Sequence, residues 1–141
     1  MQLLKLPEYE PRIQADEIFC LVRRKWISLT PEEWVRQNFL NLLIEHLSYP
    51  RGMIKLEHSM HYFKNMKRSD ITVLDREGEV FLLVECKSHK VKLSQKTVSQ
   101  LSQYNKVLNS KYLAISNGLK HFIWKKGERD FEQIDVFPSF R

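Results

Sequence analysis

Asp70, Glu85 and Lys87 are the residues of this chain whose types and spacing best suit metal chemistry. A hairpin formed by the segment between them would place Asp70 directly opposite Glu85, with the two Cβ atoms about 4.5–5.5 Å apart on one face of a sheet. Lys87, two residues further along the second strand, points to the same face. Two carboxylates that face each other destabilise a sheet unless a positive charge offsets them. We therefore predict that a divalent cation binds between Asp70 and Glu85.

The ligands of this predicted site are hard oxygen atoms, which suit Mg²⁺ or Mn²⁺ better than zinc. A magnesium ion held by one or two carboxylates keeps positions for water and phosphate oxygens, and it can lower the pKa of bound water. The backbone carbonyl of Cys86 is a further candidate ligand, because Cys86 lies between the two side chains that face the metal. Lys87 would stabilise negative charge in the transition state. These features predict a metal-dependent nuclease site.

A structural interpretation of the same residues stays open, because acidic and basic side chains at strand ends are often solvated charges. A lone aspartate followed by a Glu-x-Lys pattern also occurs by chance in many chains. Two features favour the metal site. The hairpin register brings Asp70 opposite Glu85 without adjustment, and the segment from Glu85 to Lys87 ends the most apolar strand of the chain.

The hairpin itself is predicted from two apolar runs around the polar residues 76–79. With these four residues as the loop, Asp75 faces Val80, and five further steps along the strands bring Asp70 opposite Glu85. Residues 80–84 are apolar on both faces, which is typical of a central strand that is covered on both sides. We therefore expect this strand in the middle of a sheet.

Helices are predicted on either side of the hairpin in sequence. Thr30 as N-cap and Pro31 at the first helical position begin a helix that continues to about residue 47, with Glu33 as the capping-box partner. A second helix is predicted over about residues 94–109, followed by a strand over residues 111–116. A strand, a helix and a strand make a crossover unit, so the strand after the helix should run parallel to the one that ends at Glu85. Further strands are predicted near residues 53–60, 121–125 and 131–136.

The 141 residues predict one α/β (α+β) domain with a mixed central sheet and helices on both faces. Residues 1–16 are expected to form an irregular arm, residues 17–29 an N-terminal hairpin extension, and residues 30–137 the core. Cys20 and Cys86 are too few for a zinc site or a disulfide framework. The absence of a GxxxxGK[ST] motif excludes a P-loop ATPase, so no ATP is expected. No apolar run has membrane-spanning length and no signal peptide is present, so we expect a cytoplasmic protein without a membrane partner.

Three further residues are candidates for the site. Gln100 and Tyr104 are four residues apart on the second predicted helix and share a face. A role in bracing the site or contacting phosphate competes evenly with packing of Tyr104 in the core. Glu33 would supply a third acidic group, although a purely helix-capping role is at least as well supported.

A basic segment surrounds the predicted site, in a chain with a net charge of +6. Such a cluster suits the phosphates of a nucleic acid, which bind any sequence in a salt-dependent way. A solvated basic surface is the alternative, and for any single lysine it is the better one. The candidate phosphate-binding residues are Lys64, Lys67, Arg68, Lys90, Lys92 and Lys96.

The ordered set Ser69-Asp70, Glu85-x-Lys87 and Gln100-x-x-x-Tyr104 resembles the PD-(D/E)XK nuclease superfamily. More narrowly, the chain resembles the N-terminal nuclease domain of type I restriction enzyme R subunits between about residues 18 and 124. The segments that carry this likeness are TPEEWVRQ at 30–37, LVECK at 83–87, KYL at 111–113 and SNG at 116–118.

The resemblance implies a restriction-endonuclease-like core in which Asp70 and Glu85 bind the metal and Lys87 is catalytic. It also implies that Gln100 and Tyr104 belong to a nuclease motif, and more weakly that Glu33 is the acid of the first helix. The proline of the motif is replaced by Ser69, which leaves the metal ligands intact. The helicase domains of R subunits are missing from these 141 residues, so we expect no translocation of DNA by this chain alone.

The most specific function that these observations predict is a Mg²⁺- or Mn²⁺-dependent endonuclease of restriction or repair type that hydrolyses DNA phosphodiester bonds. One alternative is a nucleic-acid-binding or assembly module that keeps the fold without turnover. Another is a small-molecule phosphatase with similar metal chemistry. DNA is the predicted partner, and a homodimer or a larger restriction or repair assembly is compatible with cutting both strands of a duplex.

Overall fold

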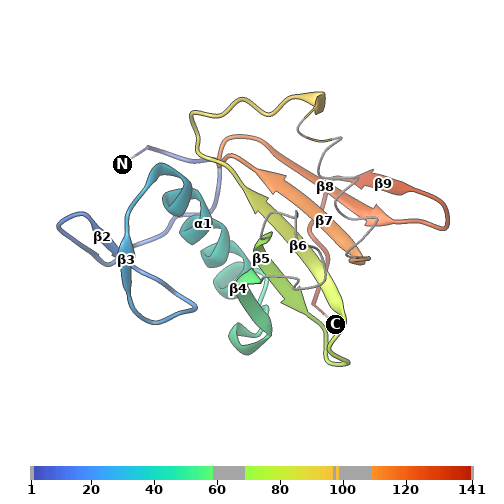
Figure 1. The fold of residues 1–141 in the computed structure, drawn as a ribbon, viewed down its shortest axis with the longest axis horizontal. Helices are drawn as coiled ribbons and strands as arrows, with labels where there is room; N and C mark the ends of the chain where they lie inside the picture. Colours follow the sequence, from blue (N-terminus) through green and yellow to red (C-terminus); the bar gives the residue numbers. More distant parts are fainter. Residues whose placement is uncertain (1, 59–68, 97, 99–108, 141) are drawn as a thin grey trace.

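The computed structural model describes residues 2–58, 69–96, 98 and 109–140, and its elements form two separate sheets and a helix (Figure 1). The larger sheet has six strands in the order β4-β5-β6-β7-β8-β9. Strands β6 and β7 are parallel and all other neighbours are antiparallel. The mixed α+β architecture predicted from the sequence is therefore confirmed. The six strands are β4 Ile54–His58, β5 Ser69–Leu74, β6 Val80–Cys86, β7 Tyr112–Ser116, β8 His121–Lys126 and β9 Phe131–Ile134.

The smaller sheet lies at the N-terminal side of the helix and is antiparallel, with strand order β1-β2-β3. Its strands are β1 Ile13–Gln14, β2 Glu17–Phe19 and β3 Trp26–Ser28. β2 and β3 form the predicted hairpin, and β1 adds a short strand from the arm of residues 1–16. Ile18 of β2 is fully buried, so one face of this sheet is covered.

Helix α1, Pro31–Asn41, begins as predicted and continues into a π-helix, Leu42–His46. The Oγ1 atom of Thr30 accepts a 3.0 Å hydrogen bond from the backbone N–H of Glu33, which caps the helix. The carboxylate of Glu33 does not take the predicted capping-box role, because its two oxygens accept from Arg36 and Gln37. A guanidinium is a stronger donor to a carboxylate than a backbone N–H, which explains this difference.

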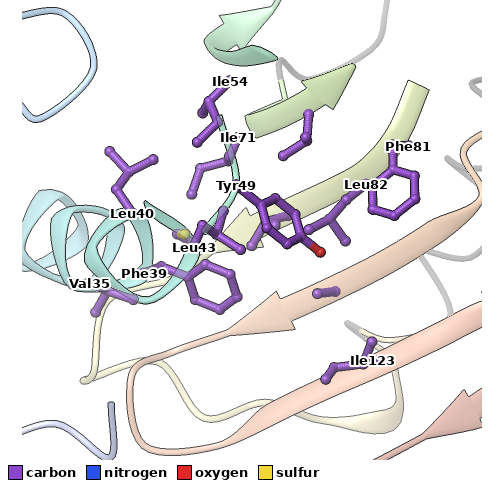
Figure 2. Packing of buried hydrophobic residues seen from close by; sticks show 14 residues of the cluster. Val35, Phe39, Leu40, Leu43, Tyr49, Ile54, Ile71, Phe81, Leu82 and Ile123 are labelled. Atoms are coloured by element: carbon purple, nitrogen blue, oxygen red, sulfur yellow. The ribbon is translucent and has the colours of Figure 1, made fainter. Parts of the chain in front are cut away.

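The core lies between α1 and the inner face of the large sheet (Figure 2). Val35, Phe39 and Leu43 are fully buried, as expected for the apolar stripe of an amphipathic helix. They belong to the same buried cluster as Ile71 of β5 and Leu82 of β6. This packing fixes α1 beside the β5–β6 hairpin (Figure 1).

The turn of the β5–β6 hairpin differs from the prediction by one residue. Leu74 pairs with Val80, and the register shifts between Val73 and Leu74. The backbone N–H of Asp75 donates to the carbonyl of Glu79 at 2.8 Å, so the predicted pairing of Asp75 with Val80 is wrong. The loop is shorter by one residue because Gly78 adopts a positive φ of +82°, which suits a three-residue hairpin loop.

A β-bulge compensates for the shorter loop. Beyond it, Ile71 pairs with Val84, which is the register predicted from the sequence. Asp70 precedes Ile71 by one residue and Glu85 follows Val84 by one, so both acidic residues lie at the end of the hairpin, next to its last pair. The predicted register at this end is therefore correct, although the turn that leads to it is not.

The opposite face of the large sheet has a smaller apolar cluster around Leu83, Leu113 and Ile115. The helix predicted over residues 94–109 falls mostly on residues 97 and 99–108, outside the described part of the chain. In the described residues, no helix has the length and apolarity needed to cross a membrane.

Candidate active site

Asp70, the second residue of β5, is buried at the end of the hairpin that lies away from the turn. Its Oδ2 atom accepts a 2.6 Å hydrogen bond from the backbone N–H of Cys86, the last residue of β6. Its Oδ1 atom lies 2.7 Å from Nη2 of Arg36. The carboxylate is therefore held on one side by the neighbouring strand and on the other side by helix α1.

Glu85 and Lys87 form an ion pair at the end of β6, with 3.1 Å between Oε1 and Nζ. The backbone N–H of Lys87 donates to the carbonyl of Ser116 at 2.8 Å, which extends the pairing of β6 with β7. Burial lowers the pKa of Lys87, but the nearby carboxylates, Glu85 foremost, raise it more, so its pKa lies above the ordinary value. Lys87 is therefore positively charged at neutral pH and can act as a cation but not as a base.

Arg36 is a buried cation of α1 at the centre of the site. Its Nη2 atom contacts Oδ1 of Asp70 at 2.7 Å and Oε1 of Glu32 at 3.2 Å, while its Nη1 atom donates to Oε1 of Glu33. Burial lowers the pKa of the guanidinium, but Glu33 and Asp70 outweigh this effect and hold its pKa above the ordinary value. Arg36 therefore links three carboxylates that come from the helix and from β5.

Glu33 lies behind Arg36 in the interior of the fold. Its Oε2 atom accepts a 2.9 Å hydrogen bond from Nε2 of Gln37, which is fully buried. The Oε1 atom of Gln37 accepts in turn from the backbone N–H of Leu21 at 3.0 Å. A continuous chain of hydrogen bonds thus leads from Asp70 to the connection between β2 and β3. Glu33 supports the site from inside and does not face solvent.

Glu32 is the carboxylate of α1 that reaches solvent, since 49% of its side-chain surface is exposed. Burial raises its pKa first, and the negative charge of Asp70 raises it further, whereas Arg36 and Lys87 lower it. A carboxylate that senses both Asp70 and Lys87 lies close to them. Glu32 is therefore the acid of the first helix that water or a substrate can reach.

Several carboxylates gather among the described side chains of the site. Three of its carboxylates are largely buried, with exposed side-chain fractions of 8% for Glu33, 11% for Asp70 and 15% for Glu85. With Glu32 they make four carboxylates, and among the described residues the printed ion pairs join them to Arg36 and Lys87. Oxygen atoms of several acidic side chains therefore gather at this end of the hairpin, as a divalent cation requires.

The residues present fit such a cation in their chemistry, because Asp70, Glu85 and the carbonyl of Cys86 offer only hard oxygen atoms. No group of three or more histidine, cysteine or acidic residues in the described chain is arranged to hold a metal ion by itself. The two carboxylates of Asp70 and Glu85 suit Mg²⁺, which usually binds one or two carboxylates and keeps several waters. The thiol of Cys86 is fully buried and burial raises its pKa, so it is not a ligand in this group.

Glu32, Arg36 and Gln37 belong to the site although no chemical role follows for them from the sequence analysis. Glu32 and Arg36 are four residues apart, and Glu33 and Arg36 are three apart, so both pairs are neighbours on a helix. Arg36 also precedes the buried Leu40 by one turn and lies on the inward face. A buried arginine requires a carboxylate partner, so its position indicated an acidic residue across the helix–sheet interface.

The other predicted site residues fall into two groups. Lys90, Lys92 and Lys96 are exposed in the segment that follows Lys87, where a polyanion can reach them. The remaining ones lie outside the described residues, so their roles stay predictions: Lys64, Lys67, Arg68, Gln100 and Tyr104.

One family model matches residues 31–138 of the chain, and it describes the N terminus of the type I restriction enzyme R protein. No curated protein matches the chain. The family match begins at the first residue of α1 and includes the whole large sheet, so it contains every residue of the site described above. Because the match spans well over half of the 141 residues, the chain belongs to the family of type I restriction enzyme R protein N termini.

Proposed function

We propose that this protein is a Mg²⁺- or Mn²⁺-dependent endonuclease that hydrolyses DNA phosphodiester bonds. The observation that carries the proposal is the convergence of Asp70, Glu85 and Lys87 at one end of the β5–β6 hairpin, where Asp70 and Glu85 are largely buried. The family adds independent support, because it is the N terminus of a restriction enzyme protein.

In this proposal Asp70 and Glu85, together with the carbonyl of Cys86, hold the cation. A bound divalent cation supplies a water of lowered pKa and neutralises charge on the phosphate. The backbone N–H of Cys86 orients Asp70, so this ligand is preorganised by the sheet. Lys87 keeps its proton and places an ammonium group where a phosphate oxygen gains charge.

The exposed Lys90, Lys92 and Lys96 would contact the DNA backbone next to the reacting phosphate. Contacts of this kind bind any sequence and weaken as salt rises. Association with DNA should therefore be strongly salt-dependent, whereas a phosphatase acting on small molecules would show no salt-sensitive DNA binding.

The test is a plasmid-nicking assay with Mg²⁺ or Mn²⁺, in which the wild type is compared with Asp70→Ala and Lys87→Ala. Glu77→Ala and Lys125→Ala are matched controls, because both remove an exposed charge outside the site. We expect nicking by the wild type and both controls and none by the two site variants. Nicking that survives both site substitutions would show that the reaction occurs elsewhere.

One observation favours a second candidate function. Asp70 and Glu85 are each already paired with a cationic side chain, as in a domain that keeps the fold without turnover. Such a nucleic-acid-binding or assembly module would bind DNA in a salt-dependent way and show no nicking with any metal. Calorimetric titration with Mn²⁺ separates the two functions, since only the nuclease requires a metal site.

A further inference from the structure

One nitrogen atom of Arg36 is shared by two carboxylates of different character. Nη2 lies 2.7 Å from Oδ1 of Asp70, a ligand in the proposed function, and 3.2 Å from Oε1 of Glu32, which is half exposed. The other terminal nitrogen, Nη1, is bound to the buried Glu33. Among the described residues, Glu33 thus holds one terminal nitrogen of the guanidinium, while Asp70 and Glu32 share the other.

A metal ion at Asp70 would change this balance. A divalent cation and a guanidinium on the same carboxylate oxygen repel each other, and this repulsion is strong in a buried site. Arg36 cannot lose its charge, because an arginine stays protonated in proteins. It can only move, and Glu32 already lies within reach of the same nitrogen.

We propose that Arg36 is an exchangeable counter-ion of Asp70, whose Nη2 atom moves from Asp70 to Glu32 when a divalent cation binds. Glu33 keeps Nη1 throughout, and Gln37 holds Glu33 in place. Arg36 is then a positioning residue. It neutralises the buried carboxylate in the absence of metal, and the metal must displace it, which weakens metal binding. This inference rests on the proposed function, because it assumes a metal at Asp70.

The first test uses the wild-type protein and follows the arginine side-chain ¹⁵N signals by NMR during a titration with Mg²⁺. The backbone amide of Cys86 reports binding at Asp70, since it donates to that carboxylate. We expect the Arg36 signals to change over the same Mg²⁺ range as the Cys86 amide. Arg12 stacks on Phe19 in the small sheet and is the control within the same spectrum, whose signals should stay constant.

The outcomes of this titration separate the two proposals. A Cys86 amide that responds while Arg36 does not would overturn the counter-ion exchange and leave the metal site standing. If neither signal responds to Mg²⁺ or Ca²⁺, the metal site of the proposed function fails, and the exchange fails with it.

A second test measures Mn²⁺ affinity by calorimetry in a double-mutant cycle of Arg36→Lys and Glu32→Gln. Lysine keeps a charge for Glu33 but cannot bridge two carboxylates with a rigid fork, so Arg36→Lys should bind Mn²⁺ about tenfold more tightly. Glu32→Gln removes the second position for Nη2 and should weaken binding about fivefold in the wild-type background, but much less in the Arg36→Lys background.

Unchanged Mn²⁺ affinity in Arg36→Lys would overturn the inference. So would an equal effect of Glu32→Gln in both backgrounds, because a simple loss of negative charge does not depend on residue 36. Circular dichroism verifies that each variant is folded. Should Arg36→Lys fail to fold, the wild-type titration still decides the matter.

Discussion

The two ends of the β5–β6 hairpin each contain a buried aspartate, and the two aspartates have similar partners. At the turn, Asp75 accepts from the backbone N–H groups of Glu77 and Glu79 at 3.0 and 2.9 Å and pairs with Lys111 at 2.7 Å. At the other end, Asp70 accepts from one backbone N–H and from one guanidinium. Burial and hydrogen bonding alone therefore do not distinguish the two residues.

The surroundings of the two aspartates do distinguish them. Asp75 is the one buried carboxylate at the turn and faces one lysine, while Glu77 and Glu79 are exposed and screened by water. Asp70 shares its end of the hairpin with two other largely buried carboxylates. We infer that Asp75 is structural and Asp70 functional, because Asp70 lies among several largely buried carboxylates whereas Asp75 is the one buried carboxylate at the turn.

The largest expected difference between the two ends is in catalysis. Asp70→Asn removes a proposed metal ligand. Mutation of a residue that only hydrogen-bonds to a metal ligand typically lowers activity about 10–100-fold, so we expect a loss above about 100-fold in plasmid nicking. Asp75→Asn keeps an oxygen for the turn and should stay within about twofold of the wild type. A similar loss in both variants would mean that the hairpin as a whole, and not the charge at one end, supports cleavage.

Metal binding should stabilise the folded protein through Asp70 and should not depend on Asp75 at the turn. At a concentration one hundred times its dissociation constant, a ligand that binds only the folded state raises the free energy of unfolding by about 2.7 kcal/mol. We expect this increase with Mg²⁺ in the wild type and in Asp75→Asn, and its loss in Asp70→Asn or after addition of EDTA. Urea denaturation with and without Mg²⁺ measures it, and an increase that persists in Asp70→Asn would contradict the assigned site.

Much of this comparison could be predicted from the sequence, because it depends on strand register. Counting outward from the polar residues between the two apolar runs predicted the register that pairs Ile71 with Val84, and the crossover rule gave the parallel pairing of β6 with β7. The turn was misplaced by one residue because a bulge costs little and leaves no periodic signal. The contact of Arg36 with Asp70 could not be assigned, because Asp70 lies on a strand more than thirty residues away in sequence. Packing of a helix on a sheet decides such contacts, and local patterns do not.

A glycine with positive φ lies in a loop at each end of the sheet. Gly78 lies in the turn of the hairpin at φ +82°, and a Cβ atom there would meet nothing within 4 Å. Gly118 lies after β7, near the site end of the sheet, at φ +85°, and a Cβ atom there would come within 2.7 Å of Leu4 and 3.2 Å of Val35. Gly78→Ala should cost about 1–2 kcal/mol from backbone strain alone, and Gly118→Ala should cost more. Equal losses in urea denaturation would show that the contacts of Gly118 relax freely.

The smallest expected effect is the pH dependence of the turn end. The pKa of Asp75 lies below its ordinary value of 3.8. The largest cause is the hydrogen bond from Lys111, and the backbone N–H groups of Glu77 and Glu79 lower the pKa further. A carboxylate whose pKa is lowered by folding stabilises the protein above its ordinary pKa and loses this contribution as pH falls through the lowered value. The free energy of unfolding should therefore fall less steeply between about pH 5 and pH 2 in Lys111→Met than in the wild type. The difference should be small, because 54% of the Lys111 side chain is exposed and water screens the pair.

Lys125→Met, which removes an exposed lysine of β8, should keep the wild-type slope. Identical slopes in all three proteins would mean that Lys111 does not stabilise Asp75.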